Sequence, residues 1–328
     1  MKKEEGIMII DATNAYIRAY IVDPSMSRTS GFPIGGIIGI LKIIQKLLTD
    51  YRPRRVYICW DGKGSSKKRR EINKNYKEGR QTIRLNRDVG LSEEEELKNK
   101  IWQQIRAIEY LNQFPFSQIM IDGVEADDII SVLCNIHHKD EDKIIISADK
   151  DFIQLVNDKT MLIRPVQEDF FDIQETLNKF SIHPRNFALA RSIIGDDSDN
   201  LKGIQGAGMK TIAKRFPMLA KDQDIFIDDI LTHCNDPNST QKIFSDVLSG
   251  KSVIEENYKI MQLSLPSMSE EAHKTIEECC VFYPFSMNKT MIKAMMIQDG
   301  FPYWNFDNLF SFCNRIMNSV SEENEIKE

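Results

Sequence analysis

The sequence predicts an α/β fold with a mostly parallel sheet, and three observations in its 328 residues favour it. Short apolar runs rich in β-branched residues have the length and composition of buried parallel strands. Stretches between them carry apolar residues at helical spacing, as at 37–48 and 101–111. The two patterns alternate along the chain, as in folds built from strand–helix–strand units. The apolar runs cover residues 6–10, 56–60, 118–121 and 143–147.

Composition excludes several classes of protein. No stretch approaches the roughly 18 apolar residues that a membrane span needs, and the apolar run 7–10 ends at Asp11, too short for a signal peptide core. We therefore expect no membrane association and a cytoplasmic location, which is the host cytoplasm if a phage encodes the chain. The six cysteines form no CxxC pair, which predicts free, mostly buried thiols rather than a zinc site.

The charge of the chain is distributed unevenly. Its formal net charge is −6, yet ten basic residues face only Glu71 and Glu78 between positions 63 and 87. Residues 63–100 are charged and weakly periodic, which predicts an exposed excursion before a helix that starts near Ile101. Such a cluster could bind nucleic acid phosphates, with affinity that falls as salt rises; the alternative is a solvated charge run or a localisation signal.

Carboxylates gather where the predicted strands end. In a parallel sheet the carboxyl ends of the strands share one edge, where ligands bind. So many like charges would repel one another unless cations were bound, and hard oxygen ligands select Mg²⁺ or Mn²⁺ over zinc. The alternative is that these acids are helix caps and solvated surface. The nine candidate metal ligands are Asp11, Asp61, Glu125, Asp127, Asp128, Asp149, Asp151, Asp196 and Asp199.

At these residues the chain resembles the 5′ nuclease family, which includes flap endonucleases, the 5′-exonuclease domain of bacterial DNA polymerase I, and phage enzymes such as phage ribonuclease H. The resemblance rests on five segments in order, including the family's GxEADD motif, its GDKD motif with Ala148 replacing glycine, and its GDxxDN motif. It implies a PIN-like core, two or more divalent ions and a helical arch over the site. The segments are 9–11, 59–62, 123–128, 147–151 and 195–200.

The basic segment occupies the position of the arch. Residues 76–80 are similar to the family's YKxNR element, with Gly79 in place of asparagine. The resemblance implies that Lys77 and Arg80 contact and polarise the scissile phosphate and that Tyr76 stacks on a base. The basic residues expected to guide a single strand are Lys67, Lys68, Arg69 and Arg70.

A glycine-rich segment follows at 203–211. It is not a nucleotide-binding P-loop, because Met209 separates Gly208 from Lys210. A helix-hairpin-helix turn that binds a DNA phosphate fits better, and the alternative is a plain helix connection. The family's corresponding helix-three-turn-helix module implies a K⁺ site here. The expected DNA contacts are Gly206, Gly208, Lys210, Thr211 and Lys214.

The domains expected are a PIN-like nuclease core at 1–190 with the arch at about 63–100, a helix-hairpin-helix module at 191–260, C-terminal helices at 261–320, and a disordered tail at 321–328. Within the module, 195–216 is expected to be a helical stretch interrupted by glycines.

The function expected is that of a monomeric, structure-specific 5′→3′ exonuclease and flap endonuclease in replication or repair. Its substrates would be flap, nicked or 5′-ended duplex DNA and RNA/DNA primers, and a single-strand-binding protein or a clamp would be its partner by analogy. Two alternatives stay open, which are a non-catalytic binder of branched DNA and a PIN-type ribonuclease.

Overall fold

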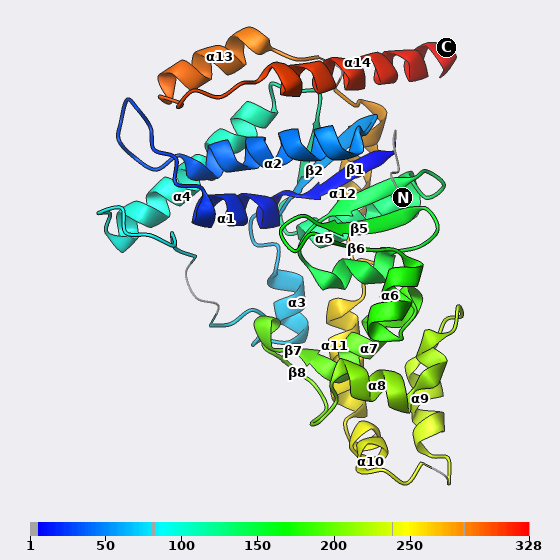
Figure 1. The fold of residues 1–328 in the computed structure, drawn as a ribbon. Coiled ribbons are helices and arrows are strands. Elements are labelled where there is room, and N and C mark those ends of the chain that lie inside the picture. The colour runs from blue at the N-terminus through cyan, green and yellow to red at the C-terminus, as the bar shows by residue number, and fades with distance from the viewer. Residues whose placement is uncertain (1–5, 80–82, 238, 285, 328) are drawn as a thin grey trace.

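The computed structural model describes residues 6–79, 83–237, 239–284 and 286–327. A six-stranded sheet in the order β3-β2-β1-β4-β5-β6 lies at its centre (Figure 1). All neighbouring strands are parallel except β6, which is antiparallel to β5. This confirms the predicted fold class, and the four predicted strands are present. The strands are β1 (Ile7–Asp11), β2 (Arg55–Trp60), β3 (Ser117–Met120), β4 (Lys143–Ile146), β5 (Thr160–Arg164) and β6 (Asp169–Phe171).

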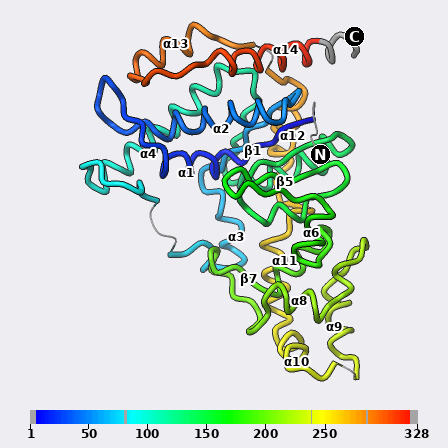
Figure 2. The backbone as a smooth tube through the Cα atoms, in the orientation of Figure 1, coloured from blue at the N-terminus to red at the C-terminus, as the bar shows by residue number. Residues whose placement is uncertain are grey.

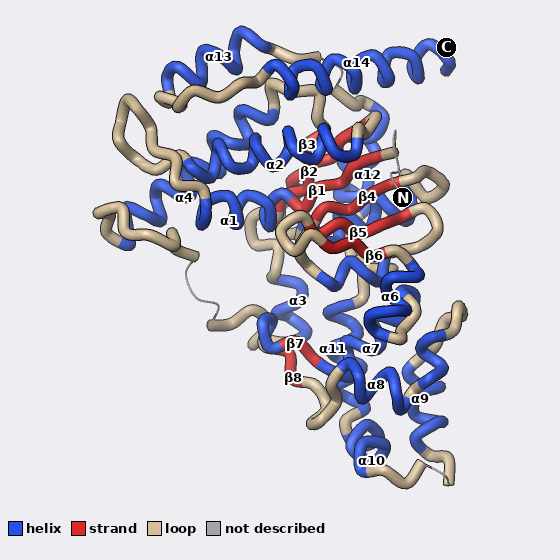
Figure 3. Tube along the Cα trace, in the orientation of Figure 1, coloured by secondary structure: helices blue, strands red, loops and turns tan. Residues whose placement is uncertain are grey.

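Helices cover both faces of the sheet, which explains why β1, β2 and β4 are almost continuously apolar. Helices α1 (Ala12–Val22) and α2 (Gly35–Tyr51) pack together on one face, and α5 (Ala126–Val132) and α12 (Glu270–Val281) pack on the other (Figure 3). Because β1, β2 and β4 are parallel, their carboxyl ends lie at one edge of the sheet. That edge carries the acidic segments.

Helix α4 (Glu93–Leu111) begins earlier than the sequence predicted. The expected start was near Ile101, but a capping box sets the start at Glu93. The Ser92 hydroxyl accepts a hydrogen bond from the Glu95 amide, and the Glu95 carboxylate accepts one from the Ser92 amide at 2.9 Å. Four glutamates in the first turn suit the positive end of the helix dipole.

A second group of helices lies beyond the β6 edge of the sheet, with α9 and α10 farthest from it (Figure 2). Its first part corrects the expectation of a helical stretch at 195–216. Residues 195–202 form a two-stranded hairpin with a 3-10 turn at Asp197–Asp199 instead, and α8 is the α-helix described in this range. The elements are α6 (Ile173–Phe180), α7 (Phe187–Ile194), β7 (Gly195–Asp196), β8 (Leu201–Lys202), α8 (Met209–Arg215), α9 (Ile227–Cys234), α10 (Lys242–Ser249) and α11 (Lys251–Met261).

The chain then returns to the sheet through α12, α13 (Lys289–Gln298) and α14 (Asp307–Lys327), and α14 packs on α2. The expected disordered tail at 321–328 is wrong, because α14 continues to Lys327. Free cysteines were expected, and the six thiols are unpaired. No helix in the described ranges has the length and apolar character of a membrane span.

Candidate active site

The structure brings most of the predicted metal ligands to one cleft at the carboxyl edge of the sheet. The cleft has a volume of about 160 Å³. Asp128 and Asp196 do not line it and instead pair with arginines at its margin. The acidic residues that line it are Asp11, Asp61, Glu125, Asp127, Asp149, Asp151 and Asp199. Segments far apart in sequence therefore converge as the strand-end argument predicted.

Asp11 and Asp61 are held by short local contacts. Asp11 ends β1 and caps α1 by accepting a hydrogen bond from the Asn14 amide at 3.1 Å. The Ser147 hydroxyl donates to its other oxygen at 2.8 Å. Asp61 follows β2 and accepts from the Ala126 amide at 2.8 Å, which ties the end of β2 to the start of α5. Each carboxylate is thus oriented by a backbone amide.

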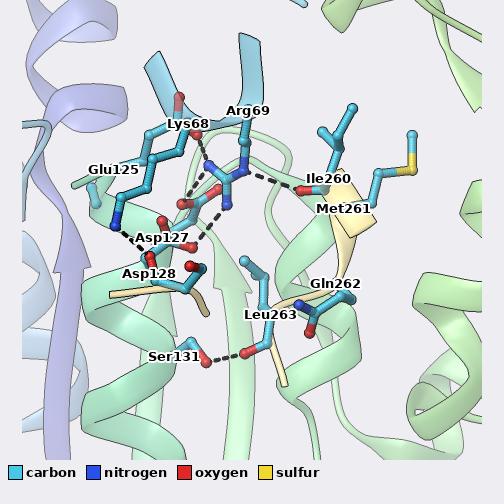
Figure 4. Close-up of polar contacts among 12 residues, drawn as sticks. Lys68, Arg69, Glu125, Asp127, Asp128, Ser131, Ile260, Met261, Gln262 and Leu263 are labelled. Atoms are coloured by element: carbon cyan, nitrogen blue, oxygen red, sulfur yellow. Dashed lines mark hydrogen bonds and ion pairs between the residues drawn. The ribbon is translucent and has the colours of Figure 1, made fainter. Parts of the chain in front are cut away.

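The carboxylates at the start of α5 are paired with cations (Figure 4). Arg69, from α3 (Lys67–Ile72), forms ion pairs with Glu125, with Asp127 at 3.1 Å and with Asp128 at 2.9 Å. Lys77 Nζ lies 2.8 Å from the other Glu125 oxygen. The Glu125 side chain is only 4% exposed, so these cations replace the water that it has lost.

A second arginine serves the remaining acids. Asp149 follows β4 and accepts a hydrogen bond from the Asp151 amide at 2.9 Å. Arg191, on α7, pairs with Asp151 at 3.1 Å and also with Asp196. The sequence analysis did not single out Arg191. A lone arginine in the apolar helix just before the GDxxDN motif was a signal that could have found it.

Crowding and burial perturb these acids. Burial raises the pKa of Asp11, Asp128 and Asp151 to about 7, and the charges of neighbouring carboxylates add to the effect. Burial likewise raises the pKa of Asp149. For Asp196 burial acts in the same direction, but hydrogen bonds from Ser198 and the charge of Arg191 outweigh it and lower the pKa. The site favours neutralising charge, by a proton or a cation.

The donor set fits a hard divalent ion, since carboxylate oxygens alone supply it. In the conformation described, however, no three His, Cys, Asp or Glu side chains of the described residues are already arranged around one point. Several of the oxygens face Arg69, Lys77 or Arg191 instead. Binding a metal at the acids of α5 therefore requires Arg69 and Lys77 to move.

The predicted DNA contacts of the basic segment divide into two groups. Lys67 and Arg70 are exposed, and Lys68 is exposed while donating to the Ser267 carbonyl at 2.8 Å. Arg69 and Tyr76 are buried. Tyr76 packs with Leu201, Ile260 and Met261, and its hydroxyl donates to Glu125 at 3.2 Å.

In this conformation the Tyr76 ring contacts protein, and the stacking of Tyr76 on a base stays a prediction. Arg80, the second residue expected at the scissile phosphate, lies outside the described residues.

The glycine-rich turn lies between β8 and α8, apart from the cleft. Gly206 has a φ of +78°, which favours glycine, and Gly208 precedes the first residue of α8. Lys210 and Lys214 are exposed one helical turn apart, and Thr211 is half-buried. These residues form a separate surface from the acidic cleft.

Comparison with known proteins identifies the family. The model of the 5′-3′ exonuclease N-terminal resolvase-like domain matches residues 6–181, more than half of the chain. This chain belongs to the 5′-3′ exonuclease family. The 5′-3′ exonuclease of Buchnera aphidicola (subsp. Schizaphis graminum) is 31% identical over 214 residues, which are 64% of this chain and 69% of that protein. The family recognised from the motifs is thereby confirmed, and the chain is a 5′ nuclease.

Two further comparisons show how much of this chain and of each similar protein the likeness covers. This family member is 28% identical to DNA polymerase I of Bacillus subtilis over 65% of its own length but only 23% of the polymerase. The phage T5 5′-exonuclease, solved with bound zinc ions, superposes with a TM-score of 0.64 at 21% identity, covering 84% of this chain and 98% of that one. The second likeness confirms the PIN-like 5′ nuclease fold.

Proposed function

We propose that this 5′ nuclease cleaves flap, nicked or 5′-ended DNA and RNA/DNA duplexes by divalent-metal catalysis, as an exonuclease and a flap endonuclease. The observation that carries the proposal is the convergence of seven carboxylates from separate segments in one cleft beside the basic segment. The chemistry needs Mg²⁺ or Mn²⁺, two or more ions, to activate water and to neutralise charge on the phosphate.

Different residues of the cleft would bind the metal ions and orient the scissile phosphate. The carboxylates of Asp11, Asp61, Asp149 and Asp199 line the cleft and would hold ions directly or through water. Among the described residues, Asp11, Asp61 and Asp149 accept hydrogen bonds from backbone amides and form no ion pair, so these three are accessible to a metal. Lys77 Nζ reaches the cleft from the arch side and would orient the scissile phosphate there.

The deciding experiment uses a flap duplex labelled at its 5′ end. Wild type should release the flap with Mg²⁺ and not with EDTA. Asp149→Asn should lose cleavage by at least about 100-fold, because it weakens a metal ligand, while still binding the flap. Unchanged turnover in Asp149→Asn would reject its role as a ligand.

Two other outcomes would favour the alternatives. Flap binding with no cleavage in either Mg²⁺ or Mn²⁺ would indicate a non-catalytic branched-DNA binder. Faster cleavage of unstructured RNA than of the flap would indicate a PIN-type ribonuclease. Duplex contact by Lys210 and Lys214, both exposed, would be supported by weaker flap binding when each is changed to alanine.

The remaining expectations from the sequence are proposals of the same kind. They are a K⁺ ion at the helix-hairpin-helix turn, a clamp or single-strand-binding partner, the monomeric state, the cytoplasmic location, and the bounds of the core, the module and the C-terminal helices.

A further inference from the structure

We infer that Arg69 is an exchangeable counterion of the α5 carboxylates, which it neutralises when no metal is bound and which it leaves when a divalent ion enters. This inference rests on the proposed metal site and makes Arg69 a positioning residue for that site. The inference concerns the role of Arg69 before the reaction. The position of Arg69 in a run of basic residues does not reveal this role.

All three nitrogens of the guanidinium donate to protein oxygens. Its two terminal nitrogens pair with Glu125, Asp127 and Asp128, and Nε donates to the Ile260 carbonyl at 3.1 Å (Figure 4). The side chain is only 10% exposed. A planar cation with several fixed donors can satisfy three carboxylates together, which a lysine ammonium does less well.

Glu125 shows why a metal must displace this cation. One of its oxygens receives Arg69 and the Tyr76 hydroxyl, and the other receives Lys77 at 2.8 Å. A divalent ion on the same carboxylate would lie within a few ångströms of the guanidinium in a site from which water is largely excluded. Repulsion between them is strong there, so the two cations exclude each other.

The contacts that attach α3 to the rest of the protein determine the position of Arg69. Lys68 donates to the Ser267 carbonyl and Asn73 to Glu256 at 2.7 Å, so contacts on both sides of Arg69 join α3 to α11 and the segment after it. These contacts do not involve the α5 acids. Arg69 can therefore leave the carboxylates while α3 stays docked, which places a free cation at the edge of the cleft.

The first test measures metal affinity without substrate. Arg69→Met removes the competing cation, and Lys67→Met, on the same helix, removes an exposed one as a matched control. We expect Mn²⁺ to bind Arg69→Met at least about threefold more tightly than wild type, since no internal cation must be displaced. Lys67→Met should match wild type. In EDTA the melting temperature of Arg69→Met should be the lowest, because three acids lose their partner.

Equal or weaker Mn²⁺ binding by folded Arg69→Met would overturn the inference, because Arg69 would then act with the metal or apart from it. Failure of flap cleavage by wild type would instead reject the proposed function, so the two failures are distinguishable.

A second test uses the unmodified protein and stays decisive if Arg69→Met does not fold. Phenylglyoxal modifies exposed arginines, and mass spectrometry locates the modified residue. Mg²⁺ should accelerate modification of Arg69 severalfold over EDTA, while the exposed neighbour Arg70 reacts at the same rate in both. Continued protection of Arg69 at saturating Mg²⁺ would show that it stays on the carboxylates.

Discussion

The carboxylate of Asp11 links metal binding to pH. Burial raises its pKa from 3.8 to about 7, so between about pH 4 and 7 the folded protein keeps a proton that the unfolded chain has released. Without metal, wild type therefore loses stability through this window as pH rises. Asp11→Asn has no carboxyl group at this position and lacks that loss. In EDTA, the unfolding free energy of Asp11→Asn minus that of wild type should therefore increase by about 1–3 kcal/mol from pH 4 to pH 8.

Urea unfolding across that range measures the difference, and taking it between variants cancels the opposing titration of the buried His138, whose pKa burial lowers to about 3. Asp50→Asn, at an exposed position, is the control for exchanging a carboxylate for an amide outside the cleft. A difference for Asp11→Asn that stays flat would contradict the raised pKa.

At the same scale, the sequence predicted the acids better than their partners. Most of the acids could be predicted because they follow a strand or open a helix, which is a local sequence pattern. Arg69 meets Ile260, 191 positions away, so no local pattern marks it as an interior cation. A run of basic residues reads as surface, and the burial of Arg69 within such a run depends on long-range packing.

At the scale of elements, the site depends on the close approach of two loops. The Gly62 amide, after β2, donates to the Val124 carbonyl at 3.0 Å, and a Cβ on Gly62 would lie 1.7 Å from the Ile121 carbonyl oxygen. Gly62→Ala must therefore push the Asp61 loop away from Glu125. It should destabilise the protein by about 2 kcal/mol or more and reduce cleavage.

The control for this backbone clash is Gly208→Ala. Gly208 has a φ of −88° and open space around its missing Cβ, so the substitution should change stability by less than about 1 kcal/mol. Chemical denaturation of both variants gives the comparison. Similar stability of Gly62→Ala and wild type would mean that the loops can separate without loss.

The same scale shows which elements a sequence reveals. Strands β1, β2, β3 and β4 are short apolar runs next to acidic turns, so composition alone located them. The hairpin of β7 and β8 has two residues in each strand, and pairing across the turn, rather than periodicity, defines it. An analysis of apolar periodicity cannot detect strands as short as these, which is why a helix was expected there.

At the scale of the whole molecule, the C-terminal third packs against the core and is part of it. The Tyr283 hydroxyl accepts a hydrogen bond from the Val56 amide at 2.7 Å and lies within hydrogen-bonding distance of the Val56 and Pro115 carbonyls. Its ring is buried against Tyr57. A segment of the C-terminal third is thus hydrogen-bonded to β2, an inner strand of the sheet.

Tyr283→Phe tests this closure. The variant keeps the ring but leaves buried backbone groups of β2 and of the residues before β3 without a partner, so the unfolding free energy should fall by about 1–3 kcal/mol. Because the segment belongs to the core, urea should still unfold the variant in one transition with the slope of wild type. Tyr303→Phe, at a side chain that is 87% exposed, should change nothing measurable. A separate early transition in Tyr283→Phe would show instead that the C-terminal helices unfold independently of the sheet.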